Sequence, residues 1–310
     1  MHLNRSSLLA VLVFAWLSSA HGHILGKSFV VYEVTDEHLD QVDLYDGTVG
    51  EWEALMGPPS LRARPDWVHP ANFYDTGAIV TPYSVSDGDW RVWLAWHRST
   101  SRIYVAMERR DDAYVDSEGE DISDASKGDA ISFMIDGDHS GGEYSFHPHL
   151  TSDVCCESDE EYRLANESQA QLYWAVADPP GVGSIAAGGE WINKSPFSEV
   201  GGAVMGNTTT LEFYVTAFDS LVWDSPDRSV RSTFSEGVVI GFELEVWDYD
   251  EPGESPLVLQ LGKQANTWRF AERFVDGVLH ASNPASVVVD STWGEIKKRR
   301  RVSAPPSTAP

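Results

Sequence analysis

Hydrophobic residues at every second position constrain the fold of this chain more than any other feature. Between residues 240 and 247 the even-numbered positions carry Ile, Phe, Leu and Val, and the odd-numbered ones carry Gly, Glu, Glu and Trp. Successive side chains of a β-strand point to opposite faces, so this alternation predicts a strand with one face in the core. Residues 131–135 and 211–215 show the same pattern. The chain is therefore expected to be built from β-strands.

The sequence shows no helical hydrophobic period longer than about three turns. Further strands are expected at residues 29–34, 90–96, 102–108, 171–177, 257–261 and 286–289, with short helices near residues 36–39 and 216–221. About nine or ten strands joined by irregular Gly- and Asp-rich connections are typical of a single sandwich domain. We expect an all-β fold, an antiparallel β-sandwich of jelly-roll type. Residues 58–82 and 182–207 are expected to form long loops over it.

The first twenty residues have the three-part pattern of a secretory signal peptide. Arg5 supplies a positive charge, residues 8–17 are an unbroken apolar run, and residues 18–20 are the small residues that precede a cleavage site. The apolar run is too short to span a bilayer as a helix, and no later segment is longer. We expect residues 1–20 to be removed and the protein to be secreted, periplasmic or at the cell surface, without a membrane span.

Charge separates the predicted domain, residues 21–296, from the end of the chain. The sequence has 48 acidic and 22 basic residues, a formal net charge of −26. A field of that sign repels a phosphate backbone, so no nucleic acid is expected as a partner. Residues 297–301 are all Lys or Arg, and a Pro/Ser-rich end follows them. Such a tail buries too little apolar surface to order itself, so residues 297–310 are expected to be disordered.

The only two cysteines, Cys155 and Cys156, are adjacent, so the chain has no framework of separated disulfides. They could form a strained ring, join two chains, or bind zinc or copper together with His147 and His149. The sequence leaves these alternatives open. Stability is therefore expected to come from buried apolar surface, which a chain that is 42% hydrophobic can supply.

An acidic segment follows the strand predicted at residues 131–135. Four of its residues could bind Ca2+ through oxygen atoms, with glycines between them that permit a tight turn: Asp136, Asp138, Ser140 and Glu143. The twelfth position of the segment is a His rather than the bidentate Glu of an EF-hand, so this is not an EF-hand. Asp and Gly are also ordinary turn residues, and the sequence does not decide between calcium and a turn. The acidic run at residues 248–251 is a second, weaker calcium candidate.

Twelve tryptophans are many for 310 residues, and they cannot all lie in the core. An exposed indole is a flat apolar surface on which a sugar ring can stack, although any single tryptophan is usually buried. Trp247 falls on the solvent-facing side of its predicted strand, beside Glu243 and Glu245. It is expected to be a binding platform on the sheet or a residue beneath a loop. The sequence has no nucleophile elbow, phosphate loop, dinucleotide fingerprint or zinc-protease motif, so catalysis is the weaker hypothesis.

Several short segments share their order with one known protein family. Asp46-Gly47 and Glu51-Trp52 open the series. The segments that follow them are residues 91–96, 103–106, 111–112, 128–138, 170–173, 211–213 and 240–248. Between residues 46 and 277 the chain resembles the family 9 carbohydrate-binding modules and their wider β-sandwich superfamily. The resemblance implies a β-sandwich that binds sugar.

In sugar-binding members of that family, two tryptophans clamp a terminal sugar and polar side chains bind its hydroxyl groups. The resemblance places one clamp tryptophan at Trp268 and the other at Ser126, so the clamp is incomplete. It places the family's Gln at Gln171 and its sugar-binding Arg at Tyr173. The carbohydrate-binding residues expected from this resemblance are Trp268, Tyr173 and Gln171, to which we add the Trp247 platform.

Three functions compete at this stage. We expect an exported, non-catalytic glycan-binding protein that uses aromatic stacking, with a structural Ca2+ stiffening the loop at Asp136. Cleavage after Ala20 would instead leave a free amine on His21, and an amine with imidazole groups chelates copper. Cleavage after Gly22 would instead leave His23 as the first residue. The third function is a surface structural or adhesion module without a small ligand.

Overall fold

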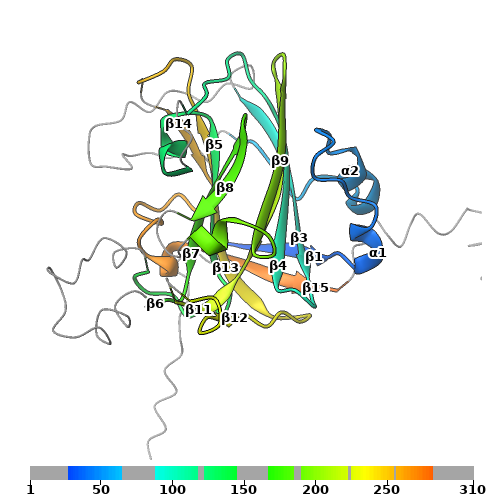
Figure 1. Ribbon diagram of the computed structural model, residues 1–310, viewed down its shortest axis with the longest axis vertical. Helices are drawn as coiled ribbons and strands as arrows, with labels where there is room; N and C mark the ends of the chain where they lie inside the picture. The colour runs from blue at the N-terminus through cyan, green and yellow to red at the C-terminus, as the bar shows by residue number, and fades with distance from the viewer. Residues whose placement is uncertain are drawn as a thin grey trace, which may run out of the picture.

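The computed structural model describes residues 27–64, 88–117, 122–144, 167–184, 190–222, 225–254 and 256–281. Within these ranges the chain is nearly all β and forms one domain (Figure 1). The predicted signal peptide, the histidines near it, the two cysteines and the basic tail lie outside the described residues. So does the strand predicted at residues 286–289. None of the described helices combines the length and the apolar character needed to cross a membrane.

Most strands belong to one 12-stranded sheet. These strands are β1 (Ser28–Glu33), β2 (Leu61–Arg62), β3 (Asp89–His97), β4 (Arg102–Arg110), β5 (Ala130–Asp136), β7 (Gln171–Ala177), β8 (Pro180–Ser184), β9 (Ser198–Met205), β10 (Thr208–Thr216), β13 (Val239–Asp248), β14 (Leu257–Gln260) and β15 (Val275–His280). A small second sheet consists of β6 (Glu167–Ser168), β11 (Phe218–Val222) and β12 (Val230–Arg231). The short helical segments are α1 (Asp36–Leu39), α2 (Gly50–Met56), η2 (Ile122–Lys127), η4 (Glu190–Asn193) and η5 (Ala271–Arg273).

The large sheet curls upon itself into two facing layers. Its strand order is β8-β7-β5-β13-β15-β1-β3-β4-β10-β9, and the two edge strands β8 and β9 lie in contact (Figure 1). Neighbouring strands are antiparallel except at β1, which pairs in parallel with both β15 and β3. The predicted single-domain β-sandwich is confirmed, with one parallel strand that the sequence pattern did not predict.

The main core lies between the two layers and uses the predicted alternation. The even-numbered residues of β13, from Ile240 to Val246, are all buried in it. The ring of Phe133 on β5 lies 6.4 Å from that of Phe213 on β10, across the two layers. Apolar burial of this kind is the main favourable term in folding. The inner faces of the sheet therefore hold the sandwich together.

Both outer faces of the sandwich are also covered by apolar side chains. On the layer that contains β5, β7 and β13, Trp174 and Trp247 lie 5.0 Å apart in a second core that includes Phe274. On the layer that contains β3, β4 and β10, Trp52 of α2 packs 6.0 Å from Tyr104 in a third core. Figure 1 shows α1 and α2 outside this layer. Many side chains that point outward from the sheet are therefore also buried, because further apolar residues cover them.

The structure corrects two expectations about secondary structure. Residues 216–221, expected as a short helix, mostly form strand β11, and residues 182–207, expected as a loop, contain β9. Strand β9 escapes prediction because glycines interrupt its alternation at points of close approach. A Cβ on Gly201 would lie 1.7 Å from the carbonyl oxygen of Leu44, and one on Gly202 would lie 2.8 Å from the backbone of Ala177. These glycines permit contacts that any side chain would prevent.

Candidate functional site

Three of the four residues expected to contact sugar are core residues. Gln171 is fully buried, and its amide exchanges two hydrogen bonds of 2.9 Å with the backbone of Phe218. Tyr173 is fully buried and donates its hydroxyl proton to the Thr216 carbonyl at 2.8 Å. Trp247 is 2% exposed and lies beneath other aromatic residues. The structure therefore corrects these three assignments, because a ligand cannot reach side chains that the protein itself covers.

Trp268 is the expected sugar-contacting residue that remains at the surface. It is half-buried and packs, as Val258 does, against the second core on the outer face of β5, β7 and β13. Two adjacent residues of the same segment, Arg269 and Phe270, are also half-buried. This segment thus presents an indole, a guanidinium group and a phenyl ring to the outside, which together offer stacking and hydrogen bonding.

A buried polar network fixes the backbone on which Trp268 stands. The Glu245 carboxylate accepts hydrogen bonds of 2.9 Å from the hydroxyl of Thr267 and from the amide of Gln260. The Glu243 carboxylate accepts the N–H of Gly262 at 2.9 Å. Burial raises the pKa of Glu245 to about 7, against the hydrogen bonds that lower it. Trp268 is therefore held on a rigid support, as a binding residue requires.

A second segment of the chain joins the first beside Trp268. Arg269 donates to the Glu143 carboxylate at 2.7 Å, and its guanidinium group lies 5.0 Å from the Phe270 ring. The side-chain amide of Gln169 donates to the carbonyls of Gly141 and Glu143 at 3.0 and 3.1 Å. We call the set Gln169, Glu143, Trp268, Arg269 and Phe270 the Trp268 surface.

The position implied for the second clamp tryptophan lies over the same face. Ser126 is half-buried in η2, and its carbonyl accepts the Tyr249 hydroxyl at 2.5 Å. Tyr249 belongs to the apolar cluster on which Trp268 packs. The two clamp positions are thus placed on one outer face, although one of them carries a hydroxyl instead of an indole.

The acidic segment at residues 136–143 forms a compact turn after β5. Both oxygens of Asp136 accept backbone N–H groups of this turn, from Ser140 at 3.2 Å and from Gly141 at 2.7 Å. Asp138 also accepts the N–H of Ser140 at 3.1 Å, whereas Glu143 points to Arg269. Burial and the neighbouring Asp138 carboxyl raise the pKa of Asp136 to about 7, against the backbone hydrogen bonds. Calcium binding by Asp136, Asp138, Ser140 and Glu143 stays a prediction.

Three buried carboxyl groups surround one buried arginine near the ends of β4 and β13. The Arg109 guanidinium group contacts Asp129 most closely, Asp111 at 2.8 Å and Asp248 at 3.4 Å. Asp129 also accepts the N–H of Val115 at 3.0 Å and that of Tyr249 at 2.8 Å. Burial raises the pKa of Asp248 to about 9, with the Arg109 guanidinium group acting against the rise and the adjacent Asp111 acting with it.

Asp248, the first member of the second calcium candidate, belongs to this buried cluster, and calcium binding there stays a prediction. Asp250 and Glu251, the other members of the second calcium candidate, are exposed. An arginine within contact distance of all three buried carboxyl groups supplies the positive charge that a cation would bring. The Arg109 cluster therefore links the end of β4, the residue that precedes β5, and the end of β13.

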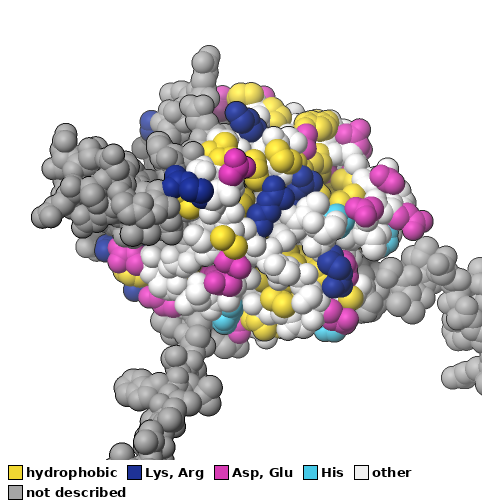
Figure 2. Space-filling model, turned by 60° about the horizontal axis from the view of Figure 1, so that its bottom comes forward, with side chains coloured by type: hydrophobic (Ala, Val, Ile, Leu, Met, Phe, Trp, Pro, Cys, Tyr) yellow, Lys and Arg dark blue, Asp and Glu magenta, His cyan; other side chains and the backbone are white. Residues whose placement is uncertain are grey.

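A second aromatic surface, which we call the Trp191 surface, contains residues that the sequence patterns did not indicate as binding residues. Trp191 and Phe197 are half-buried, with ring centroids 4.7 Å apart, and the guanidinium group of Arg231 lies 5.0 Å from the Phe197 ring. Figure 2 shows Lys and Arg side chains next to hydrophobic ones on the end of the molecule where β11 and β12 lie. The signal available in the sequence was a tryptophan within the irregular residues 182–207.

Comparisons with known proteins identify the fold. No protein-family model matches the sequence, and no curated protein matches it. A family 9 carbohydrate-binding module from Caldicellulosiruptor kristjanssonii, solved with cellotriose, superposes with a TM-score of 0.50 at 13% identity, over 86% of this chain and 100% of the module. A module of the same family and organism, solved with glucose, superposes with a TM-score of 0.50 at 11% identity, over 83% of this chain and 98% of the module. The chain therefore has the fold of the family 9 carbohydrate-binding modules.

Proposed function

We propose that this chain is an exported, non-catalytic glycan-binding protein and that the Trp268 surface binds the glycan. The observation that carries this proposal is the placement of Trp268, a half-buried indole fixed on a rigid face of this fold. Two further observations support it: the fold is shared with modules solved with cellotriose and glucose, and residues 1–20 have the pattern of a signal peptide.

The chemistry of the Trp268 surface suits a sugar ring. The apolar C–H face of a pyranose stacks on the Trp268 indole, since both are flat and apolar. The Arg269 guanidinium group and the Glu143 carboxylate, paired at 2.7 Å, bind hydroxyl groups as donor and acceptor. A structural Ca2+ in the turn at Asp136 would stiffen the segment that carries Glu143. Cello-oligosaccharides are the first ligands to test, because the two similar modules were solved with cellotriose and glucose.

Replacing Trp268 by Ala is expected to weaken glycan binding by about 5- to 150-fold, since one aromatic stacking contact contributes about 1–3 kcal/mol. Affinity electrophoresis in gels that contain a soluble polysaccharide, such as hydroxyethylcellulose or a mixed-linkage glucan, measures this change as a loss of retardation. Thermal unfolding of the variant checks that the fold persists, because Trp268 is at the surface and outside the central core.

Trp191 supplies the matched control, since it is also a half-buried tryptophan but lies in the other aromatic surface. Trp191→Ala is expected to be retarded like the wild type. If wild type and Trp268→Ala were retarded equally and Trp191→Ala were not retarded, the glycan would bind at the Trp191 surface instead. A wild type that no polysaccharide retards would contradict the proposed function.

A further inference from the structure

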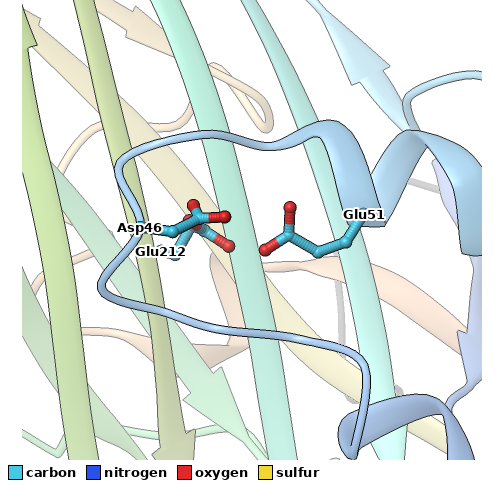
Figure 3. A group of neighbouring side chains, drawn as sticks. All are labelled: Asp46, Glu51 and Glu212. Carbon is cyan, nitrogen blue, oxygen red and sulfur yellow. The ribbon is translucent and has the colours of Figure 1, made fainter.

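Three carboxylates from separate parts of the chain converge outside the layer that contains β10. Asp46 lies in the connection between α1 and α2, Glu51 in the first turn of α2, and Glu212 on β10. Each offers an oxygen, and these oxygens all lie within 4.8 Å of one another. Figure 3 shows the three groups pointing toward one another between the connection and the strand. Like charges at this distance repel unless something positive lies between them.

The buried member of this group has an oxygen without a partner. Glu212 is 1% exposed, and its Oε1 accepts the Trp52 indole N–H at 2.5 Å. Its Oε2 is buried and makes no hydrogen bond, and the same holds for Oε1 of Glu51. Burial raises the pKa of Glu212 to about 8, with the Trp52 hydrogen bond acting against the rise and the charges of Glu51 and Asp46 acting with it. Unsatisfied buried carboxylate oxygens aimed at one point indicate a missing positive partner.

The protein supplies no such partner in the part of the chain described. Among the described residues, no Lys, Arg or His forms an ion pair with Asp46, Glu51 or Glu212. This separates the group from the other three-carboxyl cluster, where Arg109 lies in contact with every carboxyl group. It also differs from the turn at Asp136, where both oxygens accept backbone N–H groups.

We propose that Asp46, Glu51 and Glu212 form a binding site for a Ca2+ ion, independent of glycan binding and of the turn at Asp136. The donor set consists only of oxygen atoms, which suits a hard divalent cation and not zinc or copper, and Ca2+ accepts irregular oxygen geometries more readily than Mg2+. Three carboxylates supply more negative charge than one ion neutralises, which favours strong binding. Water molecules or backbone carbonyls complete the coordination.

The ion would fasten residues 40–56 to the outer face of β9 and β10. Besides the Trp52–Glu212 hydrogen bond, this attachment includes the Leu44 carbonyl against Gly201, the Thr210 hydroxyl donating to the Gly47 carbonyl at 2.9 Å, and Tyr45 donating to Glu199. The proposed ligands come from the connection, from α2 and from β10, so one ion would link all three. Bound Ca2+ is therefore expected to stabilise the third core, which α2 completes through Trp52.

Isothermal titration of the EDTA-treated, dialysed full chain with CaCl2 tests this proposal. Wild type is expected to bind Ca2+ with a Kd no weaker than about 1 mM, the weak end for extracellular sites. Glu212→Gln is expected to weaken binding at this site by about tenfold or more, because it removes a ligand charge. The amide keeps the acceptor for Trp52 and can donate toward Glu51, so this variant is expected to fold without Ca2+ at least as stably as the wild type.

Two control variants test whether the effect is specific to this site. Asp138→Asn removes a carboxylate from the other calcium candidate, and Glu37→Gln removes an exposed carboxylate from α1. Both variants are expected to bind Ca2+ at the three-carboxylate site like the wild type. Thermal unfolding gives a second readout: Ca2+ is expected to raise the Tm of wild type and both controls by a few degrees, and that of Glu212→Gln much less. Equal Ca2+ affinity in wild type and Glu212→Gln, or loss of binding in Asp138→Asn alone, would overturn the proposal.

Discussion

Arg109→Leu is expected to lower the free energy of unfolding by about 3–5 kcal/mol, because breaking a buried ion pair leaves an uncompensated charge. Arg109 is 2% exposed and contacts three carboxyl groups that are themselves buried. It also donates to the Trp247 carbonyl at 3.2 Å. Without it, Asp111, Asp129 and Asp248 must take up protons or admit water. That cost is a large fraction of the stability of a typical domain.

Urea unfolding followed by circular dichroism measures the effect as a shift of the midpoint. Arg110→Leu is the matched control, since the neighbouring side chain is exposed and approaches Glu108 only to 3.9 Å. An exposed ion pair contributes about 1 kcal/mol or less, so the control midpoint is expected to stay close to that of the wild type. If the two leucine variants unfolded at the same urea concentration, Arg109 would not hold the cluster together.

Trp52→Ala is expected to cost about 3–5 kcal/mol of stability, the usual range for removing a buried aromatic side chain. The indole is fully buried, packs against Tyr104 and donates to Glu212. The variant thus empties the centre of the third core and leaves the Glu212 carboxylate without its donor. The measurement is the free energy of unfolding in urea, with Ca2+ chelated so that ion binding does not contribute.

Trp52→Phe separates packing from hydrogen bonding at this position. The phenyl ring keeps most of the contact with Tyr104 but has no N–H for Glu212, so an intermediate loss of about 1–3 kcal/mol is expected. A loss below about 1 kcal/mol for the alanine variant would show that α2 is not fastened to the sheet through Trp52.

The alternating hydrophobic residues predicted most of the strands. Residues 171–177 form β7 as expected, and the patterns near residues 131 and 240 lie within β5 and β13. Strands β9 and β15 were not predicted because each contains glycine where alternation requires a side chain. In β15, a Cβ on Gly277 would lie 2.9 Å from Ile240 and 3.0 Å from Phe242. The packing that requires these glycines is a tertiary contact, which a local pattern does not contain.

The candidate site was predicted less well, for a related reason. Alternation shows which face of the sheet a side chain points to, but not what covers that face. Trp247 points outward as expected, yet the segment that carries Trp268 and Phe274 packs over the same face. Gln171 and Tyr173 point inward, and the family resemblance alone placed them in a site. Trp268 was also located by the family resemblance, and in the structure it lies at the surface, where its role in binding stays a prediction.

Acidic residues of the resemblance series belong to two clusters, of which only the one around Arg109 is fully buried. Asp111, Asp129 and Asp248 surround Arg109, whereas Asp46 and Glu51 meet Glu212. These positions are far apart in the sequence, so only the folded chain shows which carboxylates are neighbours. The sequence therefore identified these acidic residues but not which of them lie together in the folded chain.

The most direct test of glycan binding at the Trp268 surface follows the Trp268 indole during a glycan titration. In the 15N-labelled protein, the indole N–H resonance of Trp268 is assigned by its loss in Trp268→Phe, and cello-oligosaccharides are then added. We expect a saturable shift of this resonance, with a smaller change at Trp191. Glycan binding at the Trp268 surface would be contradicted by a saturable shift at Trp191 with none at Trp268. It would also be contradicted if a glycan that retards the protein in gels shifted neither indole resonance.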